Sequence, residues 1–242
     1  MELEFVRGVK LSESMASEAR RIANELNVLL TAHAPYYINL MSNEESKVEA
    51  SIRRIIESAE VGFKAGAWSV VFHPGYYGSL SGEECLVRVR NALKRIVNYL
   101  VDNGIKIWVR PETMGGLAEF GSLEEVVEVV SGLDYTLPCI DFAHLYARSR
   151  GEINSYDKFS KVLERVEKRL GSDALRNMHI HASGIEYGEK GEIRHLNLSE
   201  STFNYVDMVK AIKDFNVSGV IISESPNLED DALLMLSTYI NM

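Results

Sequence analysis

The chain has 242 residues, a formal net charge of −9 and a hydrophobic fraction of 46%. This length can bury a sizeable core without disulfides and fits a single α/β barrel domain spanning residues 1–242. The acidic balance disfavours nucleic-acid binding through bulk electrostatics alone, although bound divalent cations would concentrate positive charge at one place.

Targeting signals and cysteine motifs are not recognised in the sequence. No apolar run is long enough to span a bilayer, and Met-Glu-Leu-Glu-Phe-Val at the start lacks the pattern of a signal peptide. Cys85 and Cys139 form no spacing motif, so we interpret both as reduced packing residues. These features predict a cytoplasmic protein with no membrane partner.

Short apolar runs alternate with helical patterns along the whole chain. A strand is predicted at residues 2–6, and Ser-x-x-Glu capping boxes at Ser81 and Ser122 begin two of the helices. The polar stretch from Glu186 to His195 is predicted to be a loop. Six further strands are predicted, at residues 28–33, 70–73, 105–112, 137–141, 177–181 and 220–224. About seven strand–helix units of this kind favour a parallel α/β TIM barrel, incomplete at its N-terminus.

Metal-binding residue types gather where these strands end. Histidines placed for packing would scatter over helix surfaces, but all of these fall at strand ends or in the loops that follow: His33, His73, His144, His179, His181 and His195. Glu112, Asp141 and Glu224 occupy matching positions. Barrel enzymes carry their chemistry at the carboxyl ends of the strands, so the pattern predicts a metal centre there. Imidazole with carboxylate suits Zn²⁺, Mn²⁺ or Fe²⁺.

Two pairs of residues have informative spacing. Asp141 and His144 are three residues apart where a strand turns into a helix. Both side chains can therefore point into the same opening of the barrel and still bind different ions. His179 and His181 are two apart on a strand and therefore face the same way. One of the two histidines could be a ligand and the other its hydrogen-bond partner. Gly115 and Gly116 follow Glu112 in a loop where backbone can approach a ligand closely.

The motifs resemble, in order and over nearly the whole chain, those of the endonuclease IV family of apurinic/apyrimidinic endonucleases. The segments that carry the resemblance are His33-Ala-Pro-Tyr-Tyr, Phe72-His73-Pro-Gly, Glu112-Thr-Met-Gly-Gly, Cys139-Ile-Asp-Phe-Ala-His144, Met178-His179 and Ser223-Glu224. The resemblance implies a TIM barrel with three metal ions, usually zinc. It also implies hydrolysis of the phosphodiester 5′ to an abasic site in damaged duplex DNA.

The resemblance assigns roles to particular residues. It implies one ion on His33, His73 and Glu112, with Glu112 bridging to a second ion held by Asp141, His179 and Glu224. A third ion would take His144 and His195. Glu112 and Glu224 would be the catalytic residues, with Glu224 orienting the attacking water. Tyr36 matches an aromatic that the family inserts at the lesion, and Arg7 and Lys10 follow the first strand, where the family contacts DNA. The alternative interpretation is a surface aromatic for Tyr36 and solvated charges for Arg7 and Lys10, and the pattern slightly favours it for the two charges.

The chain departs from the family pattern in two places. Ile193 stands where the family has an aspartate ligand of the third ion, with Glu192 next to it, so either Glu192 turns in or this ion is held weakly. The family's first strand and helix also have no counterpart. The hypothesis that follows is a barrel partly open at this gap, or covered by self-association through the open edge.

Two other functions remain open. A xylose-isomerase-like sugar isomerase or epimerase could use Glu112, Asp141, His179 and Glu224 around one ion. Such an enzyme does not require the remaining histidines, which favour the nuclease: His33, His73, His144 and His195. A metal-binding relative that has lost nuclease activity is the third interpretation, motivated by Ile193 and the missing first unit.

Overall fold

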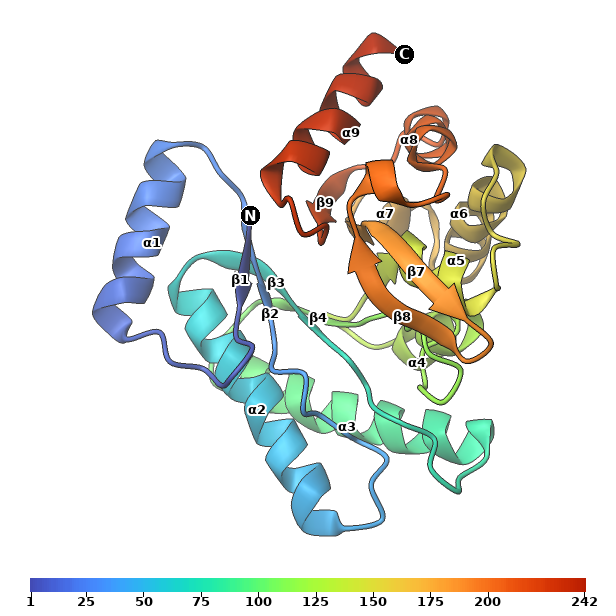
Figure 1. The fold of residues 1–242 in the computed structure, drawn as a ribbon. Coiled ribbons are helices and arrows are strands. Elements are labelled where there is room, and N and C mark those ends of the chain that lie inside the picture. Colours follow the sequence, from blue (N-terminus) through green and yellow to red (C-terminus); the bar gives the residue numbers. More distant parts are fainter. The chain divides into compact units, whose positions relative to one another are not determined.

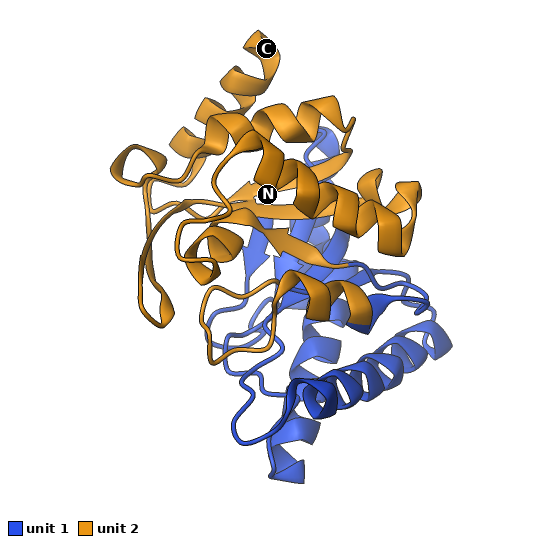
Figure 2. Ribbon diagram, turned by 90° about the vertical axis from the view of Figure 1, so that its right-hand side faces the viewer, with its two compact units in different colours: residues 1–112, 129–137 blue, residues 113–128, 138–242 orange.

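The computed structural model describes all 242 residues, and their contacts divide them into two compact units. Unit 1 comprises residues 1–112 and 129–137, and unit 2 comprises residues 113–128 and 138–242 (Figure 2). The single-domain prediction stays a prediction.

Unit 1 is a parallel sheet with helices between its strands (Figure 1). The four strands pair in chain order: β1 (Glu2–Glu4), β2 (Leu30–His33), β3 (Ala67–Phe72) and β4 (Trp108–Pro111). The intervening helices are α1 (Glu13–Glu25), α2 (Glu45–Lys64) and α3 (Gly82–Asp102). Each connection contains a helix, as parallel pairing of neighbouring strands requires. The ends of β2, β3 and β4 bring His33, His73 and Glu112 to neighbouring positions in the sheet.

Helix α3 shows how the sequence pattern builds this unit. Val89, Leu93 and Ile96 recur at helical spacing and are fully buried. The predicted capping box is present, because the Glu84 amide donates to Ser81 Oγ while the Ser81 amide donates to the Glu84 carboxylate. The sequence therefore specifies both where this helix begins and which of its faces is buried.

Unit 2 contains a second parallel sheet and an antiparallel hairpin. The sheet has the order β5 (Cys139–Asp141), β6 (Met178–Ala182) and β9 (Gly219–Ser223), and the hairpin consists of β7 (Gly184–Gly188) and β8 (Gly191–Leu196). The helices are α4 (Leu123–Val130, whose last two residues belong to unit 1), α5 (Phe142–Arg148), α6 (Tyr156–Leu170), α7 (Ser172–Leu175), α8 (Tyr205–Asp214) and α9 (Glu229–Asn241), with a 3₁₀ turn at Leu198–Glu200.

Seven parallel strands, four in unit 1 and three in unit 2, agree with the predicted count of strand–helix units. The prediction of a loop from Glu186 to His195 was wrong, because most of this stretch forms the hairpin. Three strands also begin two or three residues later than predicted, β2 at Leu30, β4 at Trp108 and β5 at Cys139. None of the helices combines the length and apolar character needed to cross a membrane.

The Ser81 cap gives a first prediction. Ser81→Ala removes the side-chain acceptor of the Glu84 amide and should lower the free energy of unfolding by about 1 kcal/mol. Urea denaturation followed by circular dichroism measures this change. Ser46→Ala, in the exposed first turn of α2, is the control, and an equal loss in both variants would contradict the capping role.

Candidate metal centre

In unit 1, two histidines converge on one carboxylate oxygen. The Nε2 atoms of His33 and His73 both lie 3.2 Å from Oε2 of Glu112. His33 and Glu112 are fully buried, and His73 is largely buried. The three side chains come from the ends of β2, β3 and β4, as the strand-end pattern predicts. We call this group the unit 1 triad.

The orientation of His33 explains why a cation suits the unit 1 triad. His33 Nδ1 lies 2.7 Å from the carbonyl oxygen of Ala34, which can only accept, so Nδ1 carries the proton. A neutral His33 would then point its Nε2 lone pair at the Glu112 carboxylate. That arrangement is repulsive unless Nε2 is also protonated or a metal ion lies between the two groups. A backbone carbonyl on the far nitrogen is the usual partner of a metal-binding histidine.

Unit 2 repeats this arrangement with other residues. His144 Nδ1 lies 2.9 Å from the carbonyl of Thr113, and His195 Nδ1 lies 3.2 Å from the carbonyl of Glu224. The two Nε2 atoms are 3.3 Å apart. The Glu192 carboxylate lies between them, 3.1 Å from His144 Nε2 and 3.4 Å from His195 Nε2. Glu192 does turn in toward the two histidines, and the three residues form what we call the Glu192 cluster.

A β-bulge in the hairpin places Glu192 there. Glu186 pairs with Arg194 and Tyr187 pairs with Glu192, so Ile193 is an extra residue on β8. In a regular strand, residues three apart point to opposite faces. The extra residue shifts this alternation of side chains by one position, so Glu192 points to the same face as His195. The Ile193 side chain is 61% exposed. Residue 193, where the endonuclease IV family has an aspartate, is therefore bulged outward. The longer side chain of Glu192, one residue earlier, lies beside the histidines instead.

Close backbone contact holds the bulged strand in position. The Glu192 amide donates to the Gly115 carbonyl over 3.2 Å, and a Cβ atom on Gly191 would lie 2.1 Å from that same oxygen. A Cβ atom on Gly115 would lie 2.6 Å from the Glu192 carboxylate. Arg148 donates to the carbonyls of Gly116 and Glu119 in this loop. The missing side chain of Gly115 thus makes room for Glu192, and the predicted close approach of this loop to a ligand stays a prediction.

A third group in unit 2 consists of Asp141, His181 and Glu224. One ligand atom from each lies within 4.8 Å of the others, and His181 Nδ1 is 3.2 Å from Glu224 Oε1. The Asp141 carboxylate accepts the His144 amide through Oδ1, while its buried Oδ2 makes no hydrogen bond and lies 3.4 Å from His144 Nδ1. His181, rather than the predicted ligand His179, faces Glu224. His179 and His181 point the same way, so strand alternation could not separate them.

The distances in these groups fit a tetrahedral ion. Ligand atoms 2.0–2.1 Å from zinc lie about 3.3 Å from one another in tetrahedral geometry. The histidine–carboxylate contacts of the unit 1 triad and the Glu192 cluster, and the His144–His195 pair, lie at 3.1–3.4 Å. Glu192 meets His144 through Oε2 and His195 through Oε1. The buried Oδ2 of Asp141, which makes no hydrogen bond, is a further oxygen that a cation would satisfy. The residues present therefore fit divalent metal ions, and zinc as the ion stays a prediction.

The charges of these groups shift their pKa values strongly. Burial lowers the pKa of His33, but the Glu112 carboxylate outweighs burial and raises that pKa to about 9. Burial likewise opposes protonation of His195, yet Glu192 raises its pKa to about 9. Burial raises the pKa of Glu192, and the two histidines overcome this and hold it well below its usual range. The raised pKa values favour the cationic form of His33 and His195 at neutral pH when no metal ion is bound.

The predicted DNA-contacting residues lie at the surface of unit 1. Tyr36 is 46% exposed, and its ring centroid lies 5.2 Å from those of His33 and His73. The aromatic ring therefore lies beside two of the candidate ligands, and its DNA-contacting role stays a prediction. Arg7 and Lys10 are exposed, which suits DNA contact and solvated charge equally.

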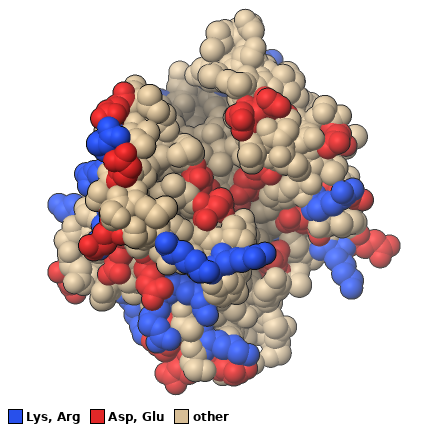
Figure 3. Space-filling view, turned by 60° about the vertical axis from the view of Figure 1, so that its left-hand side comes forward, with Lys and Arg blue, Asp and Glu red and all other residues tan.

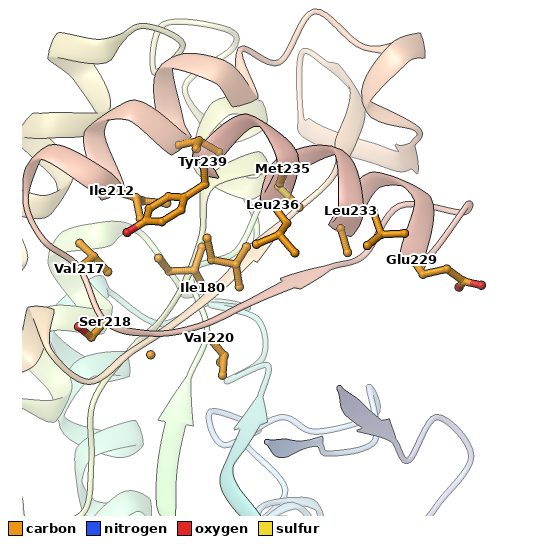
Figure 4. A pocket seen from close by; sticks show the side chains of 14 residues that line it. Ile180, Ile212, Val217, Ser218, Val220, Glu229, Leu233, Met235, Leu236 and Tyr239 are labelled. Atoms are coloured by element: carbon orange, nitrogen blue, oxygen red, sulfur yellow. The ribbon is translucent and has the colours of Figure 1, made fainter. Parts of the chain in front are cut away.

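A cavity of about 500 Å³ in unit 2 is separate from this chemistry (Figure 4). Its walls come mainly from β9, α8 and α9, and include Ile180, Ile212 and Leu236. Ile180 alternates with His179 and His181 along β6, so it faces the opposite side of the strand. The lining contains none of the predicted metal ligands. We therefore place the candidate chemistry at the histidine–carboxylate groups.

Comparisons with known proteins identify the family. The chain belongs to the xylose isomerase-like TIM barrel family, whose profile matches residues 1–237. It is 50% identical over 239 residues to the uncharacterized protein MJ0133 of Methanocaldococcus jannaschii, covering 99% of this chain and 86% of that protein.

Two solved structures share the barrel. A D-tagatose 3-epimerase-like protein matches with a TM-score of 0.76 and 23% identity, over 99% of this chain and 88% of the other. Endonuclease IV from Thermus thermophilus matches with a TM-score of 0.70 and 20% identity, over 97% of this chain and 83% of the other. These matches confirm the predicted TIM barrel, and the names of the two proteins cover two reaction classes, epimerase and nuclease.

The Glu192 cluster can be tested by counting metal ions. Glu192→Gln removes the carboxylate from between His144 and His195, so zinc content should fall by about one ion per chain. Glu189→Gln makes the same charge change at the exposed turn of the hairpin and should leave the count unaltered. Mass spectrometry of zinc-loaded protein gives the count.

A double variant tests the bulge. Ile193→Asp in the Glu192→Gln background restores the family's residue type, but the outward position of residue 193 should prevent recovery of the lost ion. Recovery would show that residue 193 reaches the histidines.

The raised pKa of His33 predicts a pH dependence of zinc affinity. Below about pH 9 the metal-free His33 is protonated, so zinc must displace a proton before Nε2 can bind. Affinity of the unit 1 triad should rise about tenfold per pH unit for each proton released, up to that pH. Competition with a chromophoric chelator between pH 6.5 and 8.5 measures the slope, and the difference between wild type and His33→Gln assigns it to the unit 1 triad. A flat profile would contradict the assignment.

Proposed function

We propose that this protein is a metal-dependent phosphodiesterase that hydrolyses the bond 5′ to abasic sites in duplex DNA. One observation carries the proposal. His33, His144 and His195 each fix Nδ1 on a backbone carbonyl and present Nε2 to a carboxylate. A sugar isomerase with one ion does not need these histidines, whereas a nuclease with several ions does.

Phosphodiester hydrolysis suits a cluster of cations. Negative charge develops on the phosphoryl oxygens and on the leaving 3′ oxygen, and bound divalent ions supply Lewis acidity toward these atoms and the attacking water. On the face drawn in Figure 3, acidic and basic side chains are interspersed rather than gathered into one basic surface. With a chain charge of −9, the attraction for the DNA phosphate would have to come chiefly from the ions.

Each group of side chains would hold a different ion. The unit 1 triad would hold one ion and the Glu192 cluster another, while Asp141, His181 and Glu224 would hold a third. The Glu224 carboxylate would also accept a proton from the attacking water, because one of its oxygens stays near His195 and the other near His181. Bridging by Glu112 stays a prediction from the family resemblance. Tyr36 would stack on an exposed base or sugar at the lesion.

A sugar epimerase is the second candidate. The likeness to the D-tagatose 3-epimerase-like structure favours it, and so does the group of Asp141, His181 and Glu224, which supplies the ligand types of a single-ion site. In that enzyme Glu224 would exchange a proton with the sugar carbon. In such an enzyme the Glu192 cluster would not take part in catalysis.

A cleavage assay distinguishes the two reactions. Zinc-loaded protein should cut a labelled duplex on the 5′ side of a single abasic analogue, leaving a 3′ hydroxyl, and should spare the undamaged duplex. His195→Gln should lower the rate on the order of a hundredfold, equivalent to about 3 kcal/mol of transition-state stabilisation. Glu189→Gln is the control.

The opposite pattern would support the epimerase. Turnover of a ketose by both wild type and His195→Gln, with no cleavage of abasic DNA by either, would contradict the nuclease proposal. Chelation followed by return of zinc shows whether a lost activity is a loss of metal.

A further inference from the structure

A fourth cluster of metal-binding side chains lies in the sheet of unit 2. Cys139, His179 and His181 offer ligand atoms that all lie within 4.8 Å of one another, and all three residues are fully buried. Cys139 on β5 pairs in register with His179 on β6, just as Asp141 pairs with His181. Residues two apart on a strand share a face, so Cys139 and His179 lie one step along the strands from Asp141 and His181.

His181 belongs to both groups through different nitrogens. Its Nδ1 lies 3.2 Å from Glu224, and its Nε2 lies 3.2 Å from Nε2 of His179. The rings of His179 and His181 are nearly perpendicular, at 73°, with centroids 5.0 Å apart. Two imidazole nitrogens at this separation either share one proton or bind one cation. The cysteine sulfur beside them supplies the third donor that a cation needs.

The donor set differs in chemistry from every histidine–carboxylate group described above. Thiolate is a soft ligand that selects Zn²⁺ and Cu⁺ over Mg²⁺ or Mn²⁺. Full burial also matters, because the cost of a buried ion grows with its uncompensated charge. With one thiolate and two neutral imidazoles as ligands, the complex of Zn²⁺ has a net charge of +1 and the complex of Cu⁺ is neutral. A thiophilic ion is therefore the cation that this cluster fits.

We propose that Cys139, His179 and His181 form a separate thiolate-containing site for a thiophilic metal ion. Binding forms a bond from the ion to the Cys139 sulfur and releases the thiol proton to solvent. The ion engages Nε2 of His181 and leaves Nδ1 directed at Glu224. Where the neighbouring group of Asp141, His181 and Glu224 also holds an ion, the His181 ring releases its remaining N–H proton to solvent and bridges the two ions as an imidazolate. The site shares His181 with that group, but it does not depend on whether the protein is a nuclease or an epimerase.

Cobalt provides a direct probe, because Co²⁺ bound to a thiolate shows an intense charge-transfer absorption in the near ultraviolet that nitrogen and oxygen ligands do not give. Full-length metal-free protein titrated with Co²⁺ should develop this band. Cys139→Ser should lose it while keeping the weaker visible bands of the other sites. Cys85→Ser changes the one other cysteine, which is buried in helix α3, and should keep the band.

Absence of the band in wild type, or its survival in Cys139→Ser, would overturn the proposal and leave His179 as a hydrogen-bond partner of His181. X-ray absorption of zinc-loaded wild type needs no variant at Cys139. It should show a sulfur neighbour at about 2.3 Å in addition to nitrogen and oxygen. Nitrogen and oxygen neighbours alone would equally overturn the site. Abasic-DNA cleavage, measured in parallel, reports on the proposed function separately.

Discussion

The candidate centre depends on one constraint, the backbone carbonyl that each of three histidines meets at Nδ1. A carbonyl can only accept, so His33, His144 and His195 are each committed to protonation at Nδ1. Every Nε2 lone pair is then directed at a carboxylate or another imidazole. Because such contacts repel between neutral histidines, the arrangement requires cations, either protons or metal ions. The raised pKa values and the tetrahedral spacing are two consequences of the same geometry.

Much of this could be predicted because parallel strands carry their chemistry at their carboxyl ends. Runs of apolar residues located the strands to within a few residues, and the residues after them are His33, His73 and Glu112 in unit 1. The helix starts at Ser81 and Ser122 followed from their capping residues. These features depend on local chemistry or on strand period alone, which a single sequence displays directly.

Two features could not be predicted, because they depend on which residues lie opposite each other across strands. The bulge at Ile193 arises from the pairing of β7 with β8, and the sequence shows only a polar stretch there. Without the bulge, residue 193 would face the same way as His195, and Glu192 would face away. The choice between His179 and His181 likewise depends on how far each lies along β6 relative to Glu224. Alternation alone treats them as equal.

The bulge also determines how Ile193 should be interpreted. If the side chains of β8 alternated regularly, isoleucine in place of the aspartate of the endonuclease IV family would indicate a metal site that has lost a ligand. The bulge changes that conclusion, because it brings the longer Glu192 carboxylate to within 3.1 Å of His144, and Gly115 and Gly191 are the residues whose missing side chains allow it. A random loss of one ligand would not be expected to coincide with a compensating bulge and two matching glycines. The Glu192 cluster therefore favours a retained metal site over a degenerate one.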